Sequence, residues 1–208
     1  LRTIGATLLA LAVLTPGHLQ AHAQGEDYVV FRFLENAIEG HFEIAAPDLA
    51  EKLGVTIEPG TDKGVSSVRA SAASVQAYIA RHFAVGPEGQ PPYVLEFVRY
   101  DTTSLAQGLF AQYHFRVETG PLPDRLAITH NMFYEDDRLH RGLVLVEFNA
   151  KTNTTYPGEY TAMVFNPNNS EQTLDLTAIP SIMSPRDMIV RFEEPAHPLD
   201  GARLEFRR

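Results

Sequence analysis

The densest group of chemically capable side chains in this chain is Glu135-Asp-Asp-Arg-Leu-His140, which places three carboxylates and one imidazole within six residues. Carboxylate oxygens together with an imidazole nitrogen suit zinc, copper or nickel better than calcium. We therefore predict a divalent transition-metal site at Asp136, Asp137 and His140, with His130 as an additional candidate ligand. The competing interpretation is a solvated hairpin connection between two strands, with His130 as a hydrogen-bonded core histidine, because most polar loops carry no site.

A second histidine stands between two acids, in the segment Glu39-Gly-His41-Phe-Glu43. The segment alternates with a period of two, so these three polar residues share one face of a strand. The other face is apolar and holds Ile38, Phe42 and Ile44. We expect an ordinary solvated strand face with weak charge pairs, and metal binding there is the less favoured alternative.

Signatures of catalysis are missing from the sequence. It contains no G-x-S-x-G elbow, no S-x-x-K, no H-E-x-x-H and no glycine-rich phosphate loop. It also contains no cysteine, which excludes thiol chemistry, cysteine-ligated zinc and iron–sulfur clusters. We predict a non-catalytic binding or interaction module. One alternative is a hydrolase that uses a metal-activated water at the 135–140 loop, and another is a purely structural sandwich that docks a protein partner.

Hydrophobic periodicity predicts the elements that would position these residues. Short strands dominate, and the two expected helices lie near the front, at Pro47–Gly54 and Ser71–Phe83, with a loop over 59–66. This pattern predicts a mainly β fold, an antiparallel β-sandwich of Ig-like or open-barrel type. The strands are expected at Tyr28–Leu34, Ile38–Ile44, Tyr93–Tyr100, Leu109–Val117, Arg125–Tyr134, Gly142–Asn149, Glu159–Phe165 and Thr173–Thr177.

The first 23 residues have the features of a signal peptide. Arg2 precedes the apolar run Ile4–Leu14, and Ala21-His-Ala23 supplies the small-x-small cleavage pattern. We therefore expect a periplasmic or extracellular protein, with a β-sandwich domain over residues 24–180. A proline-punctuated tail over 181–208 would add an edge strand at Met188–Phe192.

Charge and hydropathy limit the partners of this domain. The chain carries a net charge of −9, which argues against nucleic acid because binding to nucleic acid needs clustered lysine and arginine. No stretch after the signal peptide reaches the ~20 apolar residues of a membrane-spanning helix. A membrane protein or membrane domain therefore remains a possible partner rather than a part of this chain.

Several segments together resemble the extracytoplasmic N-terminal region of the HupE/UreJ-like membrane proteins. They are the opening strand pair, Pro47-Asp-Leu-Ala-Glu-Lys-Leu-Gly54, Val75-Gln-Ala-Tyr-Ile-Ala-Arg-His-Phe83, and Met132-Phe-Tyr-Glu-Asp-Asp-Arg-Leu-His140 before a strand. The most specific feature is an aspartate three residues before a histidine, here Asp137 and His140. The resemblance implies a domain of a metal-transport system, but the family's membrane helices have no counterpart here, so no transport function carries over.

Overall fold

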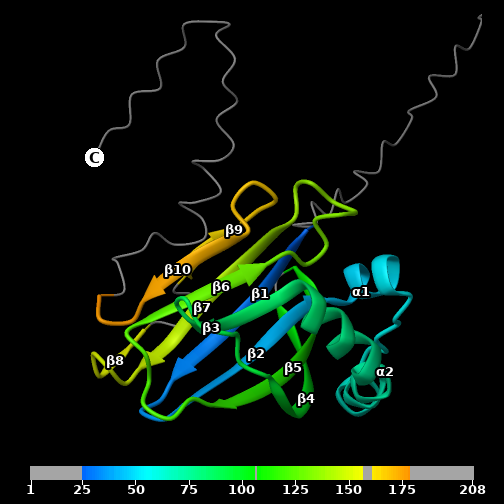
Figure 1. Cartoon of the computed structure of the whole chain (residues 1–208). Helices are drawn as coiled ribbons and strands as arrows, with labels where there is room; N and C mark the ends of the chain where they lie inside the picture. Colours follow the sequence, from blue (N-terminus) through cyan, green and yellow to red (C-terminus); the bar gives the residue numbers. More distant parts are fainter. Residues whose placement is uncertain (1–24, 106, 157–160, 179–208) are drawn as a thin grey trace, which may run out of the picture.

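The computed structural model describes residues 25–105, 107–156 and 161–178 (Figure 1). The predicted signal peptide, the C-terminal tail and the strand expected at Met188–Phe192 lie outside these residues. Within the described ranges the chain is mainly β with two helices, as predicted.

The strands form two sheets in a sandwich-like arrangement that does not close into a barrel. The larger sheet has seven strands in the order β4-β5-β2-β1-β7-β8, with β9 also paired to β7. Its strands are β1 (Glu26–Phe33), β2 (Ala37–Ala45), β4 (Glu96–Leu105), β5 (Gly108–Glu118), β7 (Arg141–Asn149), β8 (Thr154–Thr155) and β9 (Thr161–Phe165). The smaller sheet, in the order β10-β6-β3, contains β3 (Phe83–Pro87), β6 (Arg125–His130) and β10 (Glu171–Asp175).

Most of the pairing is antiparallel, as predicted, but β1 and β7 run parallel. The expectation of antiparallel pairing was therefore wrong for this one pair, at the centre of the larger sheet. Periodicity shows which face of a strand is buried, but it does not show which other strand pairs with it. The pairing of two strands that are far apart in the sequence therefore cannot be predicted from local patterns. This parallel pair is what brings the start of β1 beside the start of β7.

The first helix is confirmed and the second is longer than predicted. Helix α1 (Ala46–Leu53) ends at Gly54, which has a φ of 66°, as expected for a C-terminal cap. Helix α2 (Thr61–His82) begins at Thr61 rather than Ser71, so the predicted 59–66 loop is wrong. The glycines and serines at the start of α2 are typical of a loop. In the structure the serine hydroxyls donate to carbonyls of the preceding helical turn. Gly64 lets the helix approach β4 closely.

Several strand boundaries also differ from the prediction. Strand β4 starts at Glu96 instead of Tyr93, and β6 stops at His130 instead of Tyr134. Strand β3 was not expected, because it follows α2 without any break signal. Within β3, Gly86 has no side chain, which lets Pro92 pass within 2.7 Å of where a Cβ would stand.

The core lies on the inner face of the larger sheet, which is covered by α2 and the smaller sheet (Figure 1). Aromatic rings fill its centre: Phe42 lies edge-on to Phe83 at 4.9 Å, and Phe31 lies edge-on to Phe115 at 5.9 Å between ring centroids. The opposite, outer face carries the polar residues of β1, β2 and β5, and no element in the described ranges covers it. The predicted inward and outward residues of β2 are confirmed.

Candidate functional site

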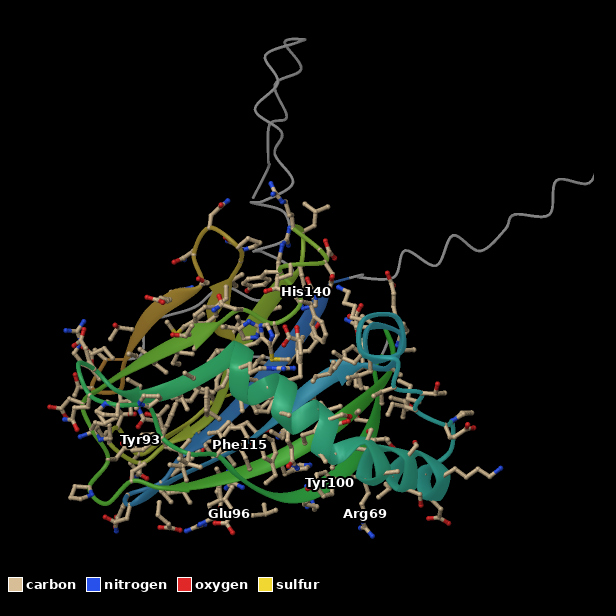
Figure 2. The ribbon with its side chains drawn as sticks, turned by 45° about the vertical axis from the view of Figure 1, so that its right-hand side comes forward. Arg69, Tyr93, Glu96, Tyr100, Phe115 and His140 are labelled. Carbon is tan, nitrogen blue, oxygen red and sulfur yellow. The ribbon has the colours of Figure 1, made fainter. Side chains whose placement is uncertain are left out.

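Two of the predicted site residues meet on an aspartate that the sequence analysis did not identify. His130 Nε2 lies 3.0 Å from Asp27 Oδ2, and His140 Nε2 lies 3.1 Å from Asp27 Oδ1. All three side chains are fully buried. We call these three residues the Asp27 cluster. It lies at one end of the larger sheet, where Figure 2 labels His140.

Three strand ends assemble this cluster. Asp27 lies at the start of β1, His130 ends β6, and His140 immediately precedes β7. The parallel pairing places Gly142 opposite Asp27. A Cβ at position 142 would lie only 2.3 Å from the His130 ring, so glycine is required there to make room for the imidazole.

The two imidazoles are enclosed by aromatic rings. His130 stacks on Phe165 at 5.6 Å and meets Phe83 edge-on at 5.9 Å. His140 lies 5.0 Å from the Phe133 ring. The interpretation of His130 as a hydrogen-bonded core histidine is therefore confirmed, whereas His140, expected on a solvated loop, is buried as well.

The carboxylate of Asp27 is ionised at neutral pH. Burial alone raises its pKa, but the charges and hydrogen bonds of His130 and His140 outweigh burial and lower the pKa to about 2. An ionised carboxylate only accepts hydrogen bonds, so each imidazole donates its Nε2–H to it. Both Nδ1 atoms are buried without a hydrogen-bond partner.

The loop that carries the predicted ligands crosses from the smaller sheet to the larger one. Tight hydrogen bonds fix it: Asp137 Oδ1 accepts from the Leu139 amide at 2.8 Å, and the Asp137 carbonyl accepts from the His140 amide at 3.1 Å. Phe133 has a φ of 63° and donates its amide to the Tyr78 hydroxyl at 2.6 Å. The loop is thus a bound crossover, and the hairpin connection considered as its alternative is wrong.

The predicted metal ligands are not gathered into one ligand set. Asp136 is exposed, and Asp137 Oδ2 lies 3.9 Å from the largely buried ammonium of Lys52. His130 and His140 direct their Nε2 atoms to different oxygens of Asp27. Within the described ranges, no group of three or more histidine, cysteine or acidic side chains is arranged to hold a metal ion. The metal site at these residues stays a prediction.

Sequence reasoning missed Asp27, although a signal was available. Asp27 shares the period-two phase of Val29, Phe31 and Phe33, so it stands on the inward face of β1. A charged residue in the apolar phase of a strand must find buried partners. With no exposed side-chain surface, the Asp27 cluster cannot touch a dissolved ligand, and its evident effect is to tie β1, β6 and the crossover together.

A second, open group of polar side chains lies on the outer face of the larger sheet. A groove of about 520 Å³ crosses β4, β5, β2 and β1. We call it the outer groove. Twelve residues line it: Val30, Arg32, Glu39, Gly40, His41, Val98, Arg99, Gln112, His114, Phe115, Arg116 and Glu147.

A row of cationic and imidazole groups crosses the outer groove. His41 and His114 are directly opposite on β2 and β5, with ring centroids 4.8 Å apart. Arg99 Nη2 lies 3.1 and 3.3 Å from the two ring nitrogens of His114. One atom nearly equidistant from both nitrogens must stand over the ring rather than in its plane. The guanidinium therefore rests on the imidazole face.

The acidic side chain beside this row already has hydrogen-bond partners. His41 bonds Glu43 at 3.2 Å, and Gln112 donates to the same carboxylate at 2.7 Å. Burial, followed by the charges of His41 and Arg99, lowers the pKa of His114 to about 4. His114 is accordingly neutral at physiological pH.

No protein-family model and no curated protein matches this sequence. Neither α1 nor α2, the helices in the described part of the chain, has the length and apolar character needed to cross a membrane. The similarity to HupE/UreJ-like proteins therefore stays a prediction.

Proposed function

We propose that this protein is an exported, non-catalytic binding module that takes a small ligand in the outer groove. The observation that carries the proposal is the gathering of three arginines and two histidines in one groove of a chain whose net charge is −9. The volume of about 520 Å³ falls within the range of small-molecule sites. Neighbouring strands supply these groups, and strands hold side chains more rigidly than loops do.

The chemistry of the groove supports binding rather than catalysis. Its lining residues include no hydroxyl, thiol or amine that could act as a nucleophile. His41 is bonded to Glu43, and His114 lies beneath a guanidinium. The other histidine pair, in the Asp27 cluster, is sealed from solvent and cannot reach a substrate.

The predicted loop metal site is not part of this proposal. The Nε2 atoms of its histidines face Asp27, and a lysine ammonium stands 3.9 Å from Asp137 Oδ2, where it would repel a second cation. The hydrolase alternative needs a metal ion at the same loop, so the arrangement of these residues does not support it either.

Export rests on residues 1–23 and needs its own test. We would fuse these residues to alkaline phosphatase, a reporter that becomes active only outside the cytoplasm. We expect activity from the fusion and none from a version in which Leu8 and Leu9 are both replaced by arginine. Equal activity in the two fusions would contradict export through this segment.

Ligand binding is best tested by amide NMR of residues 24–208 with a fragment library of mixed charge. We expect the fragments that bind to shift amides of β2, β4 and β5 around the outer groove. A library that shifts no groove amide, or one whose binders gather elsewhere on the protein, would overturn the proposed function.

A further inference from the structure

The two walls of the outer groove share a departure from regular sheet geometry. Along β4 and β5 the pairing passes from Phe97 opposite Phe115 to Arg99 opposite His114, so Val98 is an extra residue. Along β1 and β7 the pairing passes from Val146 to Phe148, which makes Glu147 the extra residue. Such bulges bend a strand and redirect side chains, and they are frequent beside functional sites.

The bulge on β4 has a chemical consequence. In a regular strand Val98 and Arg99 would point to opposite faces, but the bulge sets Arg99 opposite the outward-facing His114 while Val98 stays exposed, and both line the outer groove. Val98 is 57% exposed, so its apolar side chain is open to solvent. One wall of the groove therefore offers an apolar surface directly next to a guanidinium.

The charges of the groove leave this guanidinium without an acidic partner. Arg116 is bound to both Glu39 and Glu118. Among the residues that the structure describes, no carboxylate lies within ion-pair distance of Arg99 or Arg32, although both line the groove. The carboxylates nearest the histidine row are engaged: Glu43 by His41 and Gln112, and Asp101 by the Thr102 amide at 2.9 Å.

The geometry points to an organic carboxylate as the ligand of the outer groove, with its carboxylate on Arg99 and its apolar body against Val98. This inference rests on the proposed function and names the ligand class for the same groove. A guanidinium offers a planar pair of N–H donors that matches a carboxylate. Its stacking on neutral His114 fixes its orientation without using those donors in an ion pair.

The test compares benzoate with benzamide, which has the same ring and no charge. Binding would be measured by amide NMR on residues 24–208. We expect benzoate to shift amides around Val98 and His114, and benzamide to bind at least about tenfold more weakly, because a charged hydrogen bond is lost. The replacement Arg99→Gln should weaken benzoate binding by a similar factor.

A matched control is Arg69→Gln, which removes an exposed arginine of α2 that does not line the groove. It should leave benzoate binding within twofold of the wild type. Inorganic phosphate is the third probe, and we expect it to bind more weakly than benzoate because it lacks an apolar body.

Equal binding of benzoate and benzamide, or no effect of Arg99→Gln, would overturn the carboxylate assignment. Phosphate binding as tight as benzoate binding would overturn the role of Val98. In each of these cases, neutral or cationic fragments that still shift groove amides would leave the proposed function standing. If no fragment of any charge shifts these amides, both the proposed binding function and the assignment of a carboxylate ligand are wrong.

Discussion

The molecule contains two histidine pairs, each with a carboxylate, in opposite surroundings. In the Asp27 cluster, His130 and His140 are sealed among aromatic rings and bind the two oxygens of one aspartate. In the outer groove, the rings of His41 and His114 lie side by side, tilted by 33° to each other, on an open sheet face. The same residue types thus hold the fold together in one place and line an open groove in the other, and burial distinguishes the two places.

The two environments also separate the charge states. In the cluster, the histidines keep the carboxyl ionised, and the pKa of Asp27 falls to about 2. In the groove, burial together with the charges of His41 and Arg99 lowers the pKa of His114 to about 4 and keeps its imidazole neutral. A buried charge is costly to leave unpaired, whereas an exposed pair is screened by solvent. Mutations should therefore cost far more stability in the cluster than in the groove.

The largest effect is expected from Asp27→Asn. The amide removes the charge and places an NH₂ group against one Nε2–H, so a buried hydrogen bond is lost. We expect a loss of about 3 kcal/mol in the free energy of unfolding, measured by urea denaturation. Asp136→Asn, on the exposed part of the crossover, is the control and should change stability by less than about 0.5 kcal/mol. Equal effects of the two variants would contradict the structural role of the cluster.

Acid should weaken the fold through the same carboxyl. The pKa of Asp27 lies at about 2 in the folded protein, below its ordinary value of 3.8. Its contribution is therefore fully present above about pH 4 and disappears as the pH falls toward 2, with a size of roughly 2 kcal/mol. Urea midpoints between pH 5 and pH 2 would measure this loss. The slope should be shallower in Asp27→Asn, and an unchanged slope would show that other carboxyls dominate acid unfolding.

A Cβ at position 142 should also destabilise the cluster. Gly142→Ala would put that atom 2.3 Å from the His130 ring, so the imidazole must move away from Asp27. We expect a loss of about 2 kcal/mol, in the range of core overpacking. In a His130→Ala background the same change should cost much less, because the clash has gone. Equal costs in the two backgrounds would show that the penalty lies in the backbone.

The sequence predicts the outer groove better than the Asp27 cluster, because only the groove lies on strands with a visible alternation of polar and apolar residues. The outer groove lies on strands whose alternation is visible, so the outward positions of Glu39, His41 and Glu43 were predicted correctly. Its bulges at Val98 and Glu147 were not predicted, because an extra residue shifts the alternation without any marker in the sequence.

The Asp27 cluster was only half predicted. His130 and His140 were chosen for their chemistry, but their partner comes from a strand more than a hundred positions earlier. The parallel pair of β1 and β7 creates that contact, and strand pairing over such a distance leaves no local periodicity. The position of Asp27 on the inward face of β1 is enough to predict that it is a buried acid. The sequence does not show that His130 and His140 are its partners.

The smallest stability effect is expected in the groove, and it tests the comparison most directly. His114→Gln removes an imidazole that contacts the ring of His41 and lies under Arg99, without leaving a buried charge. We expect the free energy of unfolding to stay within about 0.5 kcal/mol of the wild type, because the site is only half-buried.

The matched variant His130→Gln, in the sealed cluster, should cost at least about 2 kcal/mol, since it loses a hydrogen bond to a buried carboxylate and leaves the space between the aromatic rings poorly filled. Urea denaturation of the two variants side by side would measure the difference. Similar losses would mean that burial does not separate the two histidine pairs, and that the groove also serves to stabilise the fold.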